Sequence, residues 1–415
     1  MGASELPVTS ATSRFASTNS AATATLLLCA AAAIFEGFDN QSMGVAAPRL
    51  AAEFALTSAQ KGWIFSAAAI GLAIGAVIGG RAADFYGRKR TLIVSLFLFG
   101  LFSILTASAT GPMSFFVARL LTGLGLGGAM PNFISLASEA VRADRRISAV
   151  TVVMAGMPFG GSIAALIALG ERFGWDWRVI FYVGGIGPIV VSLIMLRALP
   201  ESRGNTEAKG SPETAVLVDS IWKSLFGDGR GPTTLLLWTA FFFTQLVLLL
   251  MLNWLPSLIV GLGFSTTQAS WTSLCFNLSG SIGAILLARM HAGAQRRMWV
   301  VLTYVGIALA LALIPAVGKT FFLAAIACGL AGVFTVGAQL ILFALAPLYY
   351  EHSIRGTGVG ASVAVGRVGS IVGPLFASAL LVGGGSSATV LIGILPFVAV
   401  SGAAALALCG RKQAS

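Results

Sequence analysis

Long apolar runs separated by short polar stretches dominate the chain. A helix that crosses a bilayer needs about 20 mostly apolar residues, and twelve runs reach that length. They cover residues 22–50, 60–83, 91–109, 113–138, 147–170, 179–198, 233–259, 267–288, 298–316, 320–347, 356–382 and 387–409. Because a helix satisfies its own backbone hydrogen bonds inside lipid, the pattern predicts an all-α integral membrane protein with twelve transmembrane helices.

The polar stretches between the runs predict how the chain is divided. The longest of them separates the spans into two sets of six. We therefore predict a six-helix bundle over residues 22–198, a cytoplasmic linker over 199–232 and a second six-helix bundle over 233–409. Residues 1–21, rich in Ser, Thr and Ala, are predicted to be a disordered cytoplasmic tail, and residues 410–415 a second cytoplasmic tail.

The two sets of spans also read as repeats. The fourth span contains ARLLTGLGLGGA and the tenth contains ACGLAGVFTVGA, which place Gly123 and Gly332, and Gly128 and Gly337, at equivalent positions. Two parallel six-helix halves are known from transporters, where the substrate site lies between the halves near the middle of the membrane. The repeat therefore predicts two pseudo-symmetric bundles with a site between them.

Composition and charge agree with a membrane protein. Hydrophobic residues make up 57% of the chain and charged residues 10%, whereas soluble domains carry about 25% charged residues. The net charge of +11 does not indicate a nucleic-acid partner, because the Lys and Arg residues lie in short groups between apolar runs. Nineteen of these 26 residues fall on one side and five on the other, so the positive-inside rule places both termini in the cytoplasm.

The sequence offers little sign of enzymatic chemistry. The four cysteines lie scattered in or beside apolar runs and form no spacing typical of a metal site or a disulfide framework. A GLGLGG stretch lies inside an apolar span and not after a strand, so close helix packing explains it better than nucleotide binding. We expect no enzyme activity and no cofactor.

Four charged residues lie deep in the spans, where charge is costly and usually functional. They are Glu36 and Asp39 in the first span, Arg119 in the fourth and Arg367 in the eleventh. Either a carboxylate of the first span only neutralises Arg119, or it binds a proton beside a cation that binds substrate. Both histidines lie at the membrane edge, so a coupling proton would bind a carboxylate. Glu139 is a second candidate for this role, or a gate residue.

The two deep arginines suggest the charge of the substrate. They come from opposite halves, and guanidinium groups bind carboxylates in a bidentate manner, which predicts an anionic substrate. Phe38 and Trp254 are candidates to enclose a ring, although aromatic residues are also common at lipid-facing positions. Polar side chains at mid-span depth could bind a ring hydroxyl or only a neighbouring helix; these are Gln245, Asn277 and Gln339.

The loop between the second and third spans carries a specific motif. GRAADFYGRKR, residues 80–90, resembles the signature loop GxxxD(R/K)xGRR of the major facilitator superfamily. The resemblance implies a cytoplasmic gate in which Asp84 pairs with basic residues and a helix N-terminus. Phe85 replaces the usual basic residue, and the second half has no matching Asp. The gate candidates that follow are Asp84, Arg88, Arg145 and Arg146.

Further motifs narrow the resemblance to one family. EGFD at residues 36–39 matches a DGxD motif with Glu in its first place, and ARLLTG, NWLP and AVGRVGS follow at residues 118, 253 and 364. Together they resemble the aromatic acid:proton symporters. The resemblance implies the major facilitator fold, and we expect the protein to be a monomer. It also implies proton-coupled uptake of a hydroxyphenylpropionate- or hydroxybenzoate-like carboxylate across a bacterial inner membrane by alternating access.

Three other functions remain open from the sequence. The first is transport of a different organic anion by the same mechanism. The second is proton antiport of a drug or metabolite, which the two deep arginines disfavour if the cargo is cationic or neutral. The third is a receptor or scaffold without transport, which would more naturally carry a sizeable soluble domain than a 34-residue linker over 199–232.

Overall fold

All the regular structure in the described part of the chain is helical, as predicted. The structure, a computed structural model, describes residues 9–142, 145–199, 218–290, 295–351 and 354–411. The helices before the linker are α1 (Thr9–Glu53), α2 (Ser58–Tyr86), α3 (Arg88–Ala107), α4 (Pro112–Glu139), α5 (Arg146–Ala168), the short η2 (Leu169–Phe173) and α6 (Arg178–Ala198). We call these helices the N-terminal half.

A second set of helices follows the linker. It contains the short α7 (Val218–Phe226) and then α8 (Gly231–Gly261), α9 (Thr266–Met290), α10 (Arg296–Ala316), α11 (Phe321–Leu345), η5 (Ala346–Tyr349), α12 (Arg355–Val382), α13 (Ser387–Gly393) and α14 (Leu395–Leu408). We call α8 to α14 the C-terminal half. Eleven helical segments within the described residues are long and apolar enough to cross a membrane, and α9, with 25 residues, takes the place of the remaining predicted span.

Three boundaries differ from the sequence prediction. Helix α1 begins at Thr9, inside the segment that we predicted to be a disordered tail, while residues 1–8 lie outside the described residues. The twelfth span is divided into α13 and α14, because Pro396 lacks the amide hydrogen that would continue the helix. The predicted linker contains α7, and its residues 200–217 also lie outside the described part.

Local sequence explains where α2 begins and ends. Thr57 caps the first turn: its hydroxyl accepts a hydrogen bond from the Gln60 amide at 3.2 Å, and the Gln60 side chain accepts one from the Thr57 amide at 2.9 Å. The helix ends at Gly87, whose φ of 88° is a conformation that glycine adopts without strain. This single residue turns the chain directly into α3 within the signature loop.

The two halves repeat the same helix packing. In the N-terminal half α2 packs on α4, α1 on α5, and α3 on both α4 and α6; in the C-terminal half α9 packs on α11, α8 on α12, and α10 on both α11 and α14. Gly123 of α4 lies against the backbone of Ala68 in α2, and Gly332 of α11 lies against the backbone of Phe276 in α9. The predicted repeat is thus confirmed, and its glycines allow equivalent helices to approach closely.

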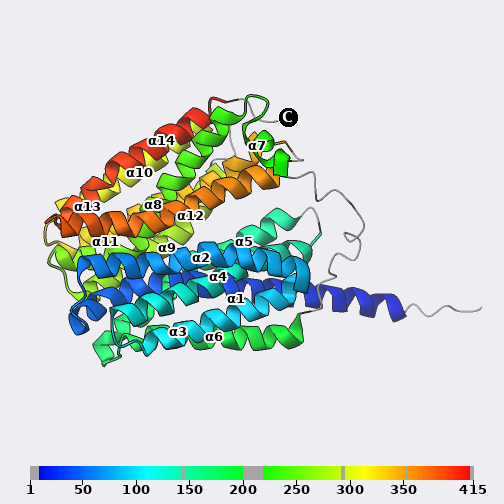
Figure 1. Cartoon of the computed structure of the whole chain (residues 1–415), viewed down its shortest axis with the longest axis horizontal. Coiled ribbons are helices and arrows are strands. Elements are labelled where there is room, and N and C mark those ends of the chain that lie inside the picture. The colour runs from blue at the N-terminus through cyan, green and yellow to red at the C-terminus, as the bar shows by residue number, and fades with distance from the viewer. Residues whose placement is uncertain (1–8, 143–144, 200–217, 291–294, 352–353, 412–415) are drawn as a thin grey trace, which may run out of the picture.

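Figure 1 shows the halves side by side, the N-terminal half in blue to green and the C-terminal half in green to red. We call the end at which α6 ends and α7 begins the linker end. The distal end is the opposite one, where α2 and α9 begin at Ser58 and Thr266. In this view α10 and α14 diverge from the N-terminal half toward the linker end (Figure 1).

The halves are joined toward the distal end. There α1, α2 and α5 pack against α8, α12 and α9. The Ser66 hydroxyl donates to the Ile371 carbonyl at 2.8 Å, and the Ser378 hydroxyl donates to the Ser58 carbonyl at 2.9 Å. At the linker end, Lys89 donates to the Leu199 carbonyl at 2.5 Å within the N-terminal half. The structure therefore shows a state that is closed at the distal end.

The glycine contacts between α2 and α4 generate a test of stability. A Cβ at Gly75 would collide with the backbone of Leu124, whereas a Cβ at Gly80 would meet no atom within 4 Å. We expect Gly75→Ala to destabilise the protein by about 1–3 kcal/mol through overpacking. Gly80→Ala should leave stability unchanged or slightly raised, and melting temperatures in detergent will compare the two. Equal melting temperatures for the two variants would contradict the packing argument.

Candidate functional site

Asp39 of α1 and Arg119 of α4 form a buried bidentate ion pair. Arg119 Nη1 donates to Asp39 Oδ1 at 2.6 Å, and Nη2 donates to Oδ2 at 2.8 Å. Each side chain is only 3% exposed. This geometry uses both terminal nitrogens of the planar guanidinium, leaves Nε without a partner among the described residues, and balances both charges in a buried position. Of the two carboxylates considered from the sequence, Asp39 is therefore the one that neutralises Arg119.

Small residues position α1 for this pair. Gly37 lies against the backbone of Met157 in α5, and Gly160 of α5 lies against the backbone of Ile34. Such contacts let two helix backbones approach closely and fix their relative rotation. The rotation holds Asp39 toward α4, where its partner Arg119 lies.

Glu36 lies one helical turn before Asp39 and has a different environment. Its side chain is 1% exposed, and neither carboxylate oxygen has a hydrogen-bond partner in the described structure. Its charge is attracted by Arg367 of α12 and repelled by Asp39. A buried carboxylate without hydrogen bonds is costly to keep ionised, so the position is suited to a group that exchanges a proton.

Arg367 brings the C-terminal half to the same site. Its Nη2 donates to the Met130 sulfur of α4 at 2.8 Å, a contact that crosses between the halves. A thioether is a weak acceptor, and a guanidinium has five N–H donors. Arg367 therefore keeps most of its capacity to bind an anion, and it lies close enough to Glu36 for the two charges to interact.

The predicted amide side chains have two different environments. The amide oxygens of Gln245 in α8 and Gln339 in α11 are buried and have no hydrogen-bond partner within the described residues. Asn277 of α9 instead donates at 2.9 Å to Gln41 Oε1 in α1 and at 2.9 Å to the Ser273 carbonyl. It thus joins the halves. Sequence reasoning missed Gln41, and the signal was a polar residue two positions after Asp39 in an apolar span.

The two predicted aromatic residues do not lie together. The Phe38 ring is 1% exposed and contacts Gly184 of α6, so it packs inside the N-terminal half. Trp254 of α8 is fully buried; its Nε1 donates to the Pro374 carbonyl at 3.1 Å, and its ring contacts Phe65 of α2. In this state Phe38 faces α6 and Trp254 lies in the distal contact, so the enclosure of one ring by both residues stays a prediction.

The gate candidates lie at the linker end and are not brought together in this state. Arg88 at the start of α3 forms an ion pair with Glu139 at the end of α4. Asp84 is exposed and forms no ion pair or side-chain hydrogen bond in the described part of the chain, and Arg145 and Arg146 are exposed as well. Glu139 therefore has a cationic partner at the edge of the bundle and lies outside the buried charge cluster.

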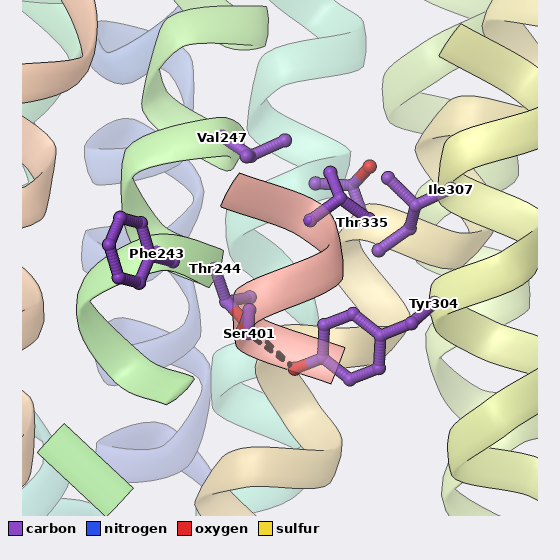
Figure 2. A pocket seen from close by; sticks show the side chains of 8 residues that line it. Phe243, Thr244, Val247, Tyr304, Ile307, Thr335 and Ser401 are labelled. Atoms are coloured by element: carbon purple, nitrogen blue, oxygen red, sulfur yellow. Dashed lines mark hydrogen bonds between the residues drawn. The ribbon is translucent and has the colours of Figure 1, made fainter. Parts of the chain in front are cut away.

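A small pocket lies within the C-terminal half. It is lined by Phe243, Thr244, Val247, Tyr304, Ile307, Thr335, Val398 and Ser401 (Figure 2). Thr244 bonds Tyr304 at 2.9 Å and Ser401 at 2.7 Å between their hydroxyl groups, and Figure 2 shows these groups meeting at one side of the pocket. The lining contains no charged residue and comes from one half, so the pocket does not meet the requirements for the predicted anion site.

Comparison with known sequences identifies one protein family and relatives that match most of the chain. The family profile described as Major Facilitator Superfamily matches residues 29–374. The chain is 39% identical to the 3-(3-hydroxy-phenyl)propionate transporter of Escherichia coli strain K12, over 94% of each chain. It is 32% identical to the 4-hydroxybenzoate transporter PcaK of Pseudomonas aeruginosa, over 92% of this chain and 91% of that one.

Comparison with solved structures agrees on the fold. The crystal structure of a D-xylose-proton symporter superposes with a TM-score of 0.76 at 18% identity, covering 93% of this chain and 97% of that one. At this identity the similarity concerns the arrangement of helices alone. It confirms the predicted transporter-type architecture of two six-helix halves.

The contrast between Asp39 and Glu36 can be tested by stability. Asp39→Asn leaves Arg119 buried without its counter-charge, which typically costs about 3–5 kcal/mol. Glu36→Gln removes a carboxylate that has no hydrogen bond, so it should not lower stability. We expect a lower melting temperature in detergent for Asp39→Asn only, with partial recovery when Arg119→Gln is added. A loss of stability in Glu36→Gln equal to that in Asp39→Asn would refute the contrast.

Proposed function

Because the chain belongs to the Major Facilitator Superfamily, we propose that it imports a small aromatic carboxylate together with protons across a bacterial inner membrane. The relatives support the class of substrate, since those matched over most of the chain are named for hydroxyphenylpropionate and hydroxybenzoate. The observation that carries the proposal is a buried Glu36 carboxylate without a hydrogen-bond partner, within electrostatic reach of Arg367 from the other half. This cation has only a weak partner.

Charge balance explains how Glu36 and Arg367 couple the binding of a proton to the binding of a substrate anion. While Glu36 is ionised, its charge compensates Arg367, and an incoming carboxylate would be repelled. Protonation of Glu36 removes that charge and leaves Arg367 to bind the substrate carboxylate. Asp39 keeps Arg119 neutralised throughout, so Glu36 is the primary proton site and the Asp39–Arg119 pair holds α1 on α4. Proton and anion thus bind together, and neither charge crosses the membrane alone.

The remaining candidates supply contacts to the ring. The free amide oxygens of Gln245 and Gln339 can accept hydrogen bonds from ring hydroxyl groups, and they belong to helices that pack on each other, α8 and α11. Asn277 acts indirectly, because its amide is already bonded to Gln41 across the interface. Phe38 supports α1 from behind through its packing on α6.

The charge distribution supports the orientation of the protein. The groups of Lys and Arg lie at the linker end, which by the positive-inside rule faces the cytoplasm with both termini. The state described, closed at the distal end, is then inward-facing. In the opposite state the bundles over 22–198 and 233–409 rock together at the linker end, where Asp84, Arg145 and Arg146 form the gate with the Arg88–Glu139 pair. A single chain holds the site and both gates, so we propose a functional monomer.

A direct test is uptake into liposomes that contain the purified protein. With an acidic outside medium we expect accumulation of radiolabelled 3-(3-hydroxyphenyl)propionate or 4-hydroxybenzoate, abolished by a protonophore. Competition by aromatic acids but not by aliphatic acids of equal charge would support an aromatic substrate. Uptake of an aliphatic anion alone would assign another organic anion, and proton-driven export of a cationic drug would assign antiport. Folded protein that moves none of these would favour a receptor or scaffold.

A second test identifies the proton site. We expect Glu36→Gln to lose accumulation driven by the pH gradient but to retain exchange of labelled for unlabelled substrate, because the neutral amide imitates the protonated acid. Glu139→Gln serves as the matched control, and its uptake should still fall as the outside pH rises. If the two variants behaved in the opposite way, the proton site would be Glu139 and not Glu36.

A further inference from the structure

Three side chains from two halves meet at the distal contact. Lys61 and Phe65 lie one turn apart on α2, and Trp254 lies on α8. The ring centroids of Phe65 and Trp254 are 5.1 Å apart at an interplanar angle of 84°, and Lys61 Nζ lies 5.1 Å from the centroid of the Trp254 ring. A Cβ at Gly62 would collide with Ser378 of α12. The glycine thus allows α2 to approach the C-terminal half closely enough to form this cluster.

Lys61 has an unusual environment for a half-buried cation. Among the described residues it forms no ion pair, and the face of Trp254 is its recorded partner. A cation–π contact is worth roughly 0.5–2 kcal/mol, which is weak compensation for partial burial of an ammonium group. A neutral residue could form this contact with a smaller desolvation cost. The charge of Lys61 therefore indicates a function other than closing the contact.

We propose that Lys61, Phe65 and Trp254 form a second binding site for the aromatic carboxylate, which is available when the halves part at the distal end. This inference rests on the proposed function. Parting α2 from α8 separates Lys61 and Phe65 from Trp254. The ammonium then binds the carboxylate of the substrate, and the freed ring faces bind its aromatic ring. The three groups together recognise the two features that define the substrate class.

When the distal end closes, the same contacts displace the bound substrate toward the deeper site. In the closed state Lys61 and Phe65 contact the Trp254 ring, where the substrate ring would bind. A bound substrate therefore has to leave the site before the distal end closes. Trp254 is bonded to Pro374, which lies seven residues along α12 from Arg367, a rise of roughly 10 Å. A substrate displaced from the distal site is therefore about two helical turns from the deeper cation.

The neighbouring contacts are suited to a gate that reopens. Ser66 and Ser378 each donate one hydrogen bond to a backbone carbonyl of the other half, Ile371 and Ser58 respectively. Neutral hydrogen bonds of this kind contribute only about 0.5–1.5 kcal/mol each. Thr266 adds one hydrogen bond to the Glu171 carboxylate at 3.0 Å. The Trp254 cluster is the part of the distal contact that combines aromatic rings with a cation, and binding of substrate to it favours the open state.

The test compares Lys61→Gln with Lys61→Arg and Lys319→Gln in the liposome assay. Lys319 is an exposed cation in the distal loop between α10 and α11, so its removal controls for the loss of general charge. We expect Lys61→Gln to raise KM for uptake about tenfold, the loss of one charge-assisted contact, with the saturated rate within about twofold. Lys61→Arg should restore KM, and Lys319→Gln should leave both constants unchanged.

A second variant reports on the ring. Phe65→Leu keeps the cation, and we expect it to reduce the preference for aromatic over aliphatic carboxylates in competition. The proposal is overturned if Lys61→Gln keeps the wild-type KM, or if its loss lies wholly in the saturated rate, which a purely structural gate would produce. If the wild-type protein moves no aromatic acid, the proposed function fails first and the distal site fails with it.

Discussion

The buried pair of Asp39 and Arg119 determines how the other charges of the protein can act. It binds both oxygens of one acid to both terminal nitrogens of one base and ties α1 to α4. Glu36 and Arg367 remain as the second acid and base, with no direct hydrogen bond between them. Had Glu36 been paired with Arg119, Asp39 would be the free carboxylate, one turn further along the helix. The bidentate geometry thus pairs one carboxylate and leaves the other without a hydrogen-bond partner, which is the basis for proposing Glu36 as the proton site.

The distribution of strong and weak contacts lets the halves move. Each ion pair between side chains that the structure describes lies within one half, as in Asp39–Arg119 and Arg230–Glu351. The contacts that cross are hydrogen bonds between neutral groups, ring contacts, bonds from a cation to a ring or a thioether, and one hydrogen bond from the Thr266 hydroxyl to the Glu171 carboxylate at 3.0 Å. Buried ion pairs are hard to separate because each charge must then be solvated. Each half is therefore held together more firmly than the two are held to one another.

Hydropathy and the glycine repeat were sufficient to predict the fold, because the bilayer restricts the chain to helices of one length. The deep charges were also identified from the sequence, because charged residues are rare within membrane spans and stand out in an apolar run. Contacts between the halves could not be predicted. The pairing of Gln41 with Asn277, or of Met130 with Arg367, joins residues more than 200 positions apart. The same limit applies to Phe38, whose direction depends on the packing of α1 against α6.

The two ends of the bundle differ in the chemistry that closes them. The linker end carries the charged residues Asp84, Arg145 and Arg146 and the Arg88–Glu139 ion pair. Charged groups form strong ion pairs only when opposite charges lie within contact distance. The distal end closes through rings, hydroxyls, one ammonium and one carboxylate, that of Glu171, which accepts a hydrogen bond from Thr266. Contacts of the second kind can be exchanged for equivalent contacts with an aromatic acid, whereas ion pairs would compete with it. In the proposed orientation the distal end receives the substrate from outside, and such an end is better built from groups that the substrate itself can replace.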